Sequence, residues 1–324
     1  MSSAIGGYFG LELSHSNNSN PHSSGSAVNS GRNALHCILQ SLKPAKVLIP
    51  RLLCDVILEP FNKLSIPYEF YSINESFKPK EISLKHGTFL LYINYFGVCD
   101  SVVKDLVNRY PSQIIIDNTQ AYFSKPIPGI PTFYSTRKFF GVPDGAYFYG
   151  VDYDLSALPL DKSWDRCTHL LKRLDLSPEE GYPESKKNDE FISTLEPARM
   201  SNLTNLILSS INFDSVRDQR AENYSYLHSK LKNRNKLGRI LPKKCSPISY
   251  PFCTENAVEM REYLTQNRIY TPIFWTGAKD LGNGNFTEHR LSMDIIHLPV
   301  DHRYDSTSIN YIVNLILNYN TGTC

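Results

Sequence analysis

Residues 133–150 read FYSTRKFFGVPDGAYFYG, and the function of the chain depends on how Lys138 in this stretch is interpreted. The stretch is rich in aromatic residues, and Ser135 precedes the lysine by three positions. This composition predicts two neighbouring strands, over 131–140 and 144–150, joined by a short turn. The lysine is either a strand residue whose ammonium group reaches water, or a partly buried amine whose lowered pKa makes it a nucleophile. The segment alone leaves both interpretations open.

Four apolar runs precede this segment, at residues 45–50, 67–73, 87–97 and 112–122. They are nearly continuous rather than alternating, which predicts strands of a mostly parallel sheet that is buried on both faces. Apolar residues at helical spacing predict helices between the strands, over 31–42 and 55–64. We therefore expect an α/β fold with a mixed, mostly parallel sheet.

The pattern changes after residue 150. A polar stretch predicts loops and a helix, and residues 200–237 carry a long helical pattern with a break near 212–214. Alternating strand and helix patterns then indicate a smaller α/β unit. We expect a large domain over residues 1–210 and a small C-terminal domain over residues 211–324. The Ser- and Asn-rich residues 14–30 predict a loop.

Composition and charge exclude several classes of function. The chain has 324 residues, 41% hydrophobic, with 34 basic and 32 acidic side chains. This balance provides no electrostatic footprint for nucleic acid or for an anionic membrane. No run reaches the roughly 20 apolar residues of a membrane span, and the N-terminal residues lack the pattern of a signal peptide. We expect a cytoplasmic protein without nucleic-acid or membrane partners.

The seven cysteines are odd in number and widely spaced, and no Cys-x-x-Cys pair occurs. A zinc site or a disulfide framework therefore has little support, and no histidine pair has metal-ligand spacing. Cys37 and Cys54 lie in apolar runs, where we expect buried thiols. We predict no metal site.

Asp117 and Gln120 end the run IIIDNTQ at residues 114–120. Ligands of open α/β sheets bind beyond the carboxyl ends of the strands, so a carboxylate at this position would face the ligand crevice. The same Asp-x-x-Gln pattern is also a helix capping box, which is the structural alternative.

The segment NSGRNAL at residues 29–35 is a Ser-Gly turn that opens a predicted helix. Free backbone N–H groups and the helix dipole at such a position favour a phosphate group. Many helices begin with Ser-Gly, so this signal alone is weak.

These three patterns occur in the order of fold-type I pyridoxal-phosphate enzymes, and the chain resembles in particular the DegT/DnrJ/StrS family of sugar aminotransferases. Residues 29–35 resemble the family's Ser-Gly-Thr-x-Ala-Leu helix start. Residues 114–121 resemble its strand ending in Glu-Asp-Ala-Ala-Gln-Ala, and residues 134–146 its Ser-Phe-x-x-x-Lys segment followed by Glu-Gly-Gly. Residues 196–208 and 290–316 are similar to its Asn-Tyr-Arg-Met helix start and its closing Leu-Ser…Leu-Pro-x-His segment.

The resemblance implies pyridoxal 5′-phosphate as the cofactor and assigns roles to its contacts. Lys138 would bind the cofactor covalently and would move a proton between the substrate carbon and the cofactor carbon. Asp117 would pair with the pyridinium nitrogen, which makes the ring a stronger electron sink. Gln120 would lie against the ring and its 3′ oxygen. The phosphate would be held by Ser135, Gly31 and Arg32.

The resemblance also implies the reaction. An amino group would pass from a donor such as glutamate to a keto sugar nucleotide, in the biosynthesis of a surface polysaccharide. The family implies a homodimer with the site near the subunit interface. On the substrate side, Arg199 is a candidate for a substrate carboxylate or phosphate, with a surface ion pair as its alternative. Trp275 is a candidate for the pocket mouth, with core or interface packing as its alternative.

The sequence departs from the family pattern at several positions. Arg32 replaces the phosphate-site threonine, Leu53 or Cys54 stands where an aromatic residue often covers the cofactor ring, and Pro197 and Ala198 replace Asn-Tyr. Three alternatives therefore stay open: a pyridoxal-phosphate lyase, a transaminase for an acceptor other than a sugar, and a non-catalytic binding protein with the aminotransferase fold. A nucleotide-binding Rossmann protein lacks support, because no Gly-x-Gly-x-x-Gly follows the first strand.

Overall fold

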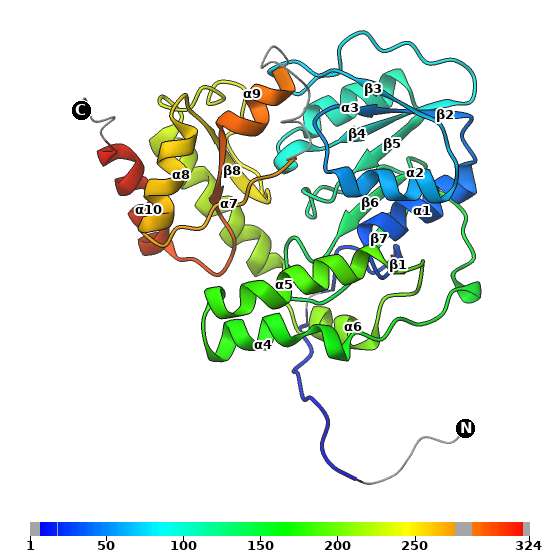
Figure 1. Cartoon of the computed structure of the whole chain (residues 1–324), viewed down its shortest axis with the longest axis horizontal. Helices are drawn as coiled ribbons and strands as arrows, with labels where there is room; N and C mark the ends of the chain where they lie inside the picture. Colours follow the sequence, from blue (N-terminus) through cyan, green and yellow to red (C-terminus); the bar gives the residue numbers. More distant parts are fainter. Residues whose placement is uncertain (1–6, 18, 276–286, 320–324) are drawn as a thin grey trace.

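The computed structural model describes residues 7–17, 19–275 and 287–319 (Figure 1). A seven-stranded sheet with the order β1-β7-β6-β5-β4-β2-β3 organises the first half of the chain. The strands are β1 (Ser26–Val28), β2 (Lys46–Pro50), β3 (Tyr68–Tyr71), β4 (Thr88–Ile93), β5 (Ile114–Asp117), β6 (Thr132–Ser135) and β7 (Ala146–Tyr149).

The neighbours from β3 to β6 pair in parallel, whereas β7 pairs antiparallel with both β6 and β1. This arrangement confirms the predicted mixed, mostly parallel sheet. All four residues of β5 and of β6 are buried, as the continuous apolar runs predicted for strands covered on both faces. Because β4, β5 and β6 run in parallel, their carboxyl ends lie along one edge of the sheet.

Helices cover the sheet and extend below it in Figure 1. The helices of the first 210 residues are α1 (Gly31–Leu42), α2 (Leu58–Lys63), α3 (Asp100–Arg109), α4 (Thr168–Asp175), α5 (Pro178–Ser193) and α6 (Asn202–Ser209). Helix α1 packs against β6 and β7 through its buried apolar face, and the Ser30 side chain accepts a hydrogen bond from the Asn33 N–H at its start. The predicted helix over 31–42 is confirmed.

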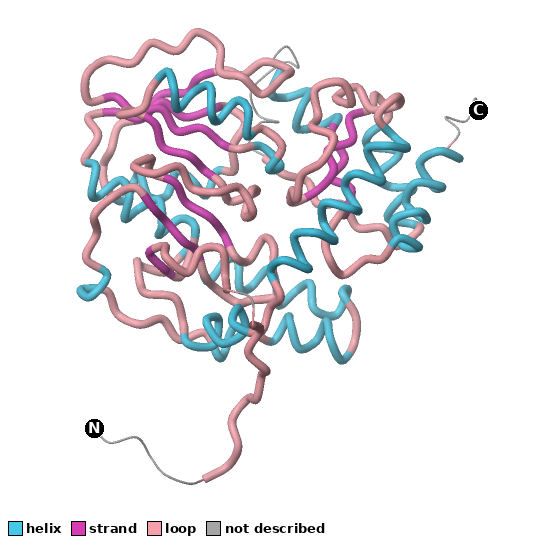
Figure 2. Tube along the Cα trace, turned by 180° about the vertical axis from the view of Figure 1, so that it is seen from behind, coloured by secondary structure: helices cyan, strands magenta, loops and turns pink. Residues whose placement is uncertain are grey.

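A second, antiparallel sheet lies beside the first in both views (Figures 1 and 2). The remaining elements are α7 (Phe213–Leu231), β8 (Ser249–Cys253), α8 (Ala257–Gln266), α9 (Thr287–Asp294), β9 (Ile295–Pro299) and α10 (Ser306–Asn318). Helices α6 and α7 are separated at residues 210–212, which confirms the predicted break in the long helical pattern. The domain boundary at residue 210 would fall in this break, and the division into domains stays a prediction.

Two sequence predictions need correction. Residues 26–28, predicted as part of a loop, form the edge strand β1, because pairing with β7 outweighs the low strand propensity of the surrounding Ser and Asn residues. The predicted strand over 131–140 ends at Ser135, and Lys138 lies in the turn that follows it. This turn carries the lysine out of the sheet at the carboxyl end of β6.

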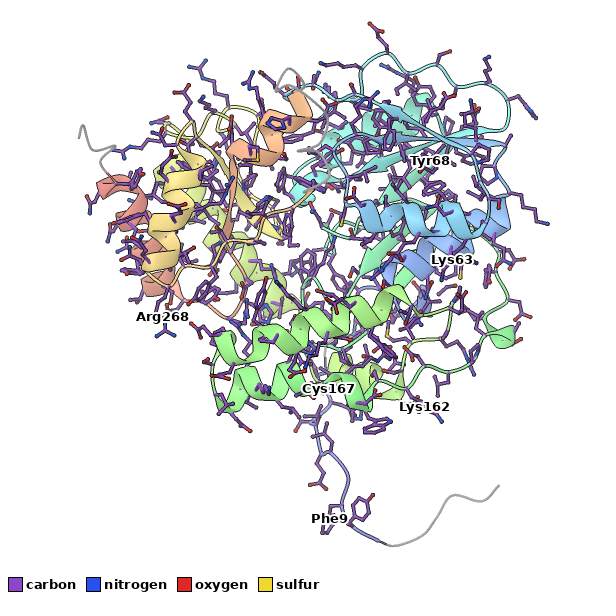
Figure 3. All side chains as sticks on the ribbon, in the orientation of Figure 1. Phe9, Lys63, Tyr68, Lys162, Cys167 and Arg268 are labelled. Atoms are coloured by element: carbon purple, nitrogen blue, oxygen red, sulfur yellow. The ribbon has the colours of Figure 1, made fainter. Side chains whose placement is uncertain are left out.

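At the other end of the molecule, Phe9 lies on an N-terminal segment that extends away from the body of the protein (Figure 3). Among the described residues, no helix is both long and apolar enough to cross a membrane.

Candidate active site

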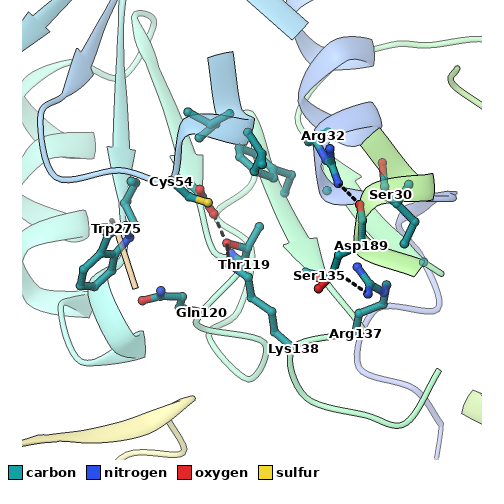
Figure 4. A pocket seen from close by; sticks show the side chains of 18 residues that line it. Ser30, Arg32, Cys54, Thr119, Gln120, Ser135, Arg137, Lys138, Asp189 and Trp275 are labelled. Atoms are coloured by element: carbon teal, nitrogen blue, oxygen red, sulfur yellow. Dashed lines mark hydrogen bonds and ion pairs between the residues drawn. The ribbon is translucent and has the colours of Figure 1, made fainter. Parts of the chain in front are cut away.

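One cavity of about 310 Å³ lies where β5, β6 and the start of α1 meet. Its size is at the lower end of the range for small-molecule sites, about 300–1,000 Å³. Seven of the predicted site residues line it: Gly31, Arg32, Asp117, Gln120, Ser135, Lys138 and Trp275 (Figure 4). The fold thus brings together residues that are up to 244 positions apart, between Gly31 and Trp275.

Asp117 ends β5 and is buried, with 5% of its surface exposed. Burial raises the pKa of its carboxyl group, and the positive charge of Lys138 and hydrogen bonds from Thr119 lower it in part. Its Oδ1 accepts a hydrogen bond from the Thr119 N–H at 2.8 Å. The carboxylate is therefore held in place at the strand end and faces the cavity, where a protonated nitrogen would stabilise its charge.

Lys138 points into the same cavity. Its Nζ donates a hydrogen bond to Oγ1 of Thr119 at 3.0 Å, and the backbone N–H of the same threonine donates to the Asp117 carboxylate (Figure 4). Thr119 thus links the amine to the acid. The side chain of Lys138 is open to the cavity rather than shielded by aromatic rings, because Phe139 and Phe140 beside it turn into a separate apolar cluster.

Gln120 and Trp275 form the opposite wall of the cavity. The Gln120 Oε1 accepts a hydrogen bond from the Phe96 N–H at 2.7 Å, which orients the side chain. The Trp275 ring contacts the rings of Tyr95 and Phe96, with centroids 5.4 and 5.1 Å apart. Trp275 therefore both packs against buried aromatic residues and lines the cavity, so the two interpretations of this residue are compatible.

The start of α1 contributes backbone N–H groups, which have no partner within the helix in its first turn. Gly31 opens the helix, and Ser135 at the end of β6 lines the same part of the cavity. A hydroxyl group and helix N–H groups that converge in this way form a suitable site for a phosphate group.

Arginine side chains beside this helix start already have carboxylate partners. Arg32 Nη1 binds both carboxylate oxygens of Glu59, at 2.8 and 2.9 Å, and its Nη2 reaches the Asp189 carbonyl oxygen at 3.4 Å. Arg137 forms an ion pair with the Asp189 carboxylate at 2.5 Å. Asp189, from α5, therefore places a negative charge in the cavity near the predicted phosphate position.

The residues of this lining that the sequence prediction did not name include Thr119, Arg137 and Asp189. Thr119 could have been found, because it lies between Asp117 and Gln120 in the same strand-end motif. Asp189 carried no sequence signal, since it lies 52 positions after Arg137 on a different element.

Cys54 and Arg199 lie in environments that the sequence did not indicate. Cys54, expected to be a buried thiol, is exposed and lines the cavity, because it precedes the short helical turn at the cavity wall. Leu53 is buried and is not part of the lining. Arg199 lies outside the cavity, where its Nε donates to the Leu158 carbonyl oxygen at 3.1 Å.

No family model matches this sequence, and no curated protein matches it. Solved structures do match. The sugar aminotransferase CalS13 from Micromonospora echinospora is 14% identical, over 91% of this chain and 87% of that chain, with a TM-score of 0.61. The aminotransferase TlmJ from Streptoalloteichus hindustanus is 13% identical, over 90% and 84%, with a TM-score of 0.62. NtdA from Bacillus subtilis, with bound cofactor PMP, is 14% identical, over 90% and 72%, with a TM-score of 0.61.

The chain has the fold of the fold-type I aminotransferases. This finding confirms the predicted fold class. This similarity concerns the backbone alone. The chemistry that the protein can perform depends on the residues of the cavity.

Proposed function

We propose that the chain is a pyridoxal-phosphate-dependent aminotransferase. The observation that carries this proposal is that Lys138, Asp117 and the start of α1 line one cavity. This cofactor requires three groups of a protein: an amine, a buried carboxylate and a helix N-terminus that can bind a phosphate.

The residues of the cavity fit the cofactor. The N–H groups at Gly31 and the Ser135 hydroxyl suit the phosphate, and the raised pKa of Asp117 reflects a buried carboxylate that a ring N–H⁺ would stabilise. Gln120 would lie against the ring. When bound, the pyridoxal group supplies an aldehyde that condenses with amines and a ring that withdraws electrons from the substrate carbon.

The chain's own groups then have separate tasks. With the cofactor bound, the Asp117 carboxylate would hold the proton of the ring nitrogen, and the Lys138 Nζ would carry a proton to and from the reacting carbon. Thr119, whose hydroxyl accepts from Lys138 and whose backbone N–H donates to Asp117, would orient the amine relative to the acid. Trp275 closes one side of the cavity against water.

For the substrates, we propose an amino acid donor such as glutamate and a keto sugar nucleotide as acceptor, in cytoplasmic biosynthesis of a surface polysaccharide. The support is that CalS13, which shares the fold over 91% of this chain, is a sugar aminotransferase. The role of Arg199 toward a substrate stays a prediction, because this side chain lies outside the cavity of its own chain.

We also propose that the protein is a homodimer. The support is a group of exposed apolar side chains on α4, α5 and the turns beside them, comprising Trp164, Leu171, Leu174, Leu176, Tyr182 and Phe191. Exposed apolar groups that cluster in this way are typical of protein interfaces.

A second candidate function is that of a non-catalytic binding protein with this fold. The specific observation in its favour is that Glu59 and Asp189 already neutralise the two arginines beside the start of α1. Such a protein would bind a ligand in the cavity without forming a covalent bond to Lys138.

Borohydride reduction tests the proposal. Purified protein is incubated with pyridoxal phosphate, reduced and digested, and mass spectrometry locates the label. We expect label on the peptide of Lys138, none there after Lys138→Ala, and full labelling of Lys138 after Lys187→Ala, which changes an exposed lysine. Binding without any label on Lys138 would favour the non-catalytic candidate. If Lys138 is labelled, a second assay measures transfer of the amino group from glutamate to the cofactor. Transfer supports the aminotransferase, and no transfer supports a lyase.

A further inference from the structure

A groove of about 620 Å³ adjoins the candidate active site on the side of α4. Lys138 and Arg137 line both the cavity and the groove, so the two spaces meet at the lysine. A second hollow of about 560 Å³ continues the groove and shares Lys138, Arg173 and Arg303 with it. A ligand whose reacting carbon lies at Lys138 can therefore extend into the groove.

The groove is rich in cationic side chains. Its described lining contains the cationic residues Arg137, Lys138, Arg173, Arg220 and Arg303, whereas Asp301 is the one acidic residue in this lining. His169 and His302 also line the groove, and burial lowers the pKa of both imidazoles. The Arg303 Nε and Nη2 donate hydrogen bonds to the two carboxylate oxygens of Asp301, at 2.6 and 2.9 Å. Arg137 forms an ion pair with Asp189. Among the described residues, no carboxylate forms an ion pair with Arg173 or Arg220.

Arg220, on α7, is the strongest indication of a ligand. It is 2% exposed, and its guanidinium group donates only to neutral acceptors, the carbonyl oxygens of Pro247 and Phe139, each at 3.2 Å. Its Nε has no hydrogen-bond partner in the described structure. Burial lowers the pKa of Arg220 to about 10, so the side chain is still charged at neutral pH.

The Asp301 carboxylate acts on Arg220 electrostatically but is bonded to Arg303, and the Arg220 guanidinium group lies over the Phe139 ring, 4.7 Å from its centroid. A ligand that supplies a directly bonded negative charge would stabilise this buried cation further. His302 adds to this indication, because its Nδ1 is also buried without a partner and the residue lines the same groove. A planar guanidinium group binds phosphate or carboxylate oxygens with paired hydrogen bonds. The chemistry of the groove is therefore that of an oxyanion site.

We propose that the groove between α4, the Lys138 turn and residues 301–303 binds an oxyanion group of the substrate, a phosphate or a carboxylate, through Arg220 and Arg173. This assignment rests on the proposed function, because it places the reacting carbon of the same molecule at Lys138. Arg220 forms the buried end of the site, and Arg173, which is exposed on α4, forms its mouth.

Calorimetric titration tests the site on the full chain, with excess pyridoxal phosphate present to fill the cavity. The probes are inorganic pyrophosphate and glutarate, which separate a phosphate source from a carboxylate source. We expect one probe to bind, with an affinity that falls as ionic strength rises. Arg173→Ala should weaken this binding at least tenfold and Arg173→Lys less. Arg239→Ala, a matched change of an exposed arginine outside the groove, should leave it unchanged.

Arg220→Met tests the buried end and should abolish binding, with folding checked by circular dichroism. Because this variant can fail to fold, the exposed Arg173 variants carry the test independently. Absence of binding for both probes, or equal binding by wild type and Arg173→Ala, would overturn the groove assignment. The borohydride label on Lys138, measured on the same samples, keeps the two proposals apart. A labelled chain that binds no probe rejects only the groove, and a chain that binds the probe without a label rejects only the proposed function.

Discussion

Asp117, Thr119 and Lys138 form the smallest unit on which the chemistry depends. Thr119 is bonded to both charged groups, through its hydroxyl to Lys138 and through its backbone N–H to Asp117, so one residue positions the amine and the acid. This unit keeps a carboxylate buried at the end of β5, which costs free energy because burial disfavours the charged form.

The stability cost of Asp117 is testable through pH. Since its pKa in the folded chain is raised above the ordinary value of 3.8, the folded state holds the proton more tightly than the unfolded state. The free energy of unfolding therefore falls as pH rises from 3.8 through the folded pKa. Asp117→Asn carries no charge and should be more stable than wild type by about 1 kcal/mol at pH 7. Urea unfolding at pH 7 and near pH 4 measures the difference, which should shrink at the lower pH. An equal difference at both values would show that the carboxyl charge is not its source.

Asp189 should oppose cofactor binding. Its carboxylate holds Arg137 at 2.5 Å and lines the cavity beside the start of α1, so it repels a phosphate at this position and competes for the arginine. Asp189→Asn should bind pyridoxal phosphate more tightly, by about 1 kcal/mol or roughly fivefold. An absorbance titration gives the affinity, with Glu190→Gln as the control for removing a neighbouring acid outside the cavity. Unchanged or weaker binding in Asp189→Asn would mean that the phosphate lies elsewhere.

At the scale of elements, hydrogen bonds connect the turn that carries Lys138, residues 136–140, to the start of α6 through Asp144. The Thr136 hydroxyl donates to the carbonyl oxygens of Asp144 and Gly145, at 2.9 and 2.7 Å, and closes the turn. The buried Asp144 carboxylate in turn accepts hydrogen bonds from the Ser201 N–H at 3.0 Å, the Ser201 hydroxyl at 2.8 Å, and the Thr204 hydroxyl. Gly145 has a φ of +112° and no room for a side chain, since a Cβ would lie 2.6 Å from the Thr136 hydroxyl.

Loss of Asp144 should therefore destabilise the chain strongly. Asp144→Ala leaves two buried donors, the Ser201 N–H and the Thr204 hydroxyl, without an acceptor, whereas the Ser201 hydroxyl keeps Ser163 as a partner. We expect this change to lower the free energy of unfolding by about 3 kcal/mol. Asp154→Ala removes an exposed cap from a three-residue helix and should lower the free energy of unfolding much less than Asp144→Ala does. Denaturant unfolding of the two variants checks the contrast. Similar losses in both would show that the link between the turn and α6 contributes little.

At the scale of the whole molecule, the exposed apolar side chains of α4 and α5 lie next to the groove that adjoins the active site. A homodimer that covers them would place its interface beside Lys138, as the resemblance to the sugar aminotransferases implies. The partner would then limit access to the groove from the side of α4.

Light scattering tests this arrangement. Wild type should have about twice the mass of the 36.9 kDa chain. The double variant Leu171→Glu with Leu176→Glu should shift toward the monomer, because it places two charges in an apolar interface. Val258→Glu, an exposed apolar residue on α8, serves as the control and should remain dimeric. A monomeric wild type, or a double variant that dimerises as the wild type does, would contradict the proposed interface.

Short segments of the sequence carried enough information to predict the sheet and much of the cavity. Continuous apolar runs indicate buried parallel strands because both faces must exclude water. The motifs around Gly31, Asp117 and Ser135 each lie at the end of one element, so their position follows from local structure. Lys138 lines the same cavity as these motifs, although its strand ends at Ser135, five residues earlier than expected.

The pairing of distant charges was decided only by the tertiary structure. Arg32 is bound to Glu59 and Arg137 to Asp189, and the groove joins residues from α4, α7 and the loop after β9. No local pattern encodes such contacts, because they depend on how helices far apart in the sequence pack against one another. The sequence by itself therefore determined the strands and the motifs at their ends. Only the tertiary structure decided which charges are neutralised and which, like Arg220, remain buried without a directly bonded counter-ion.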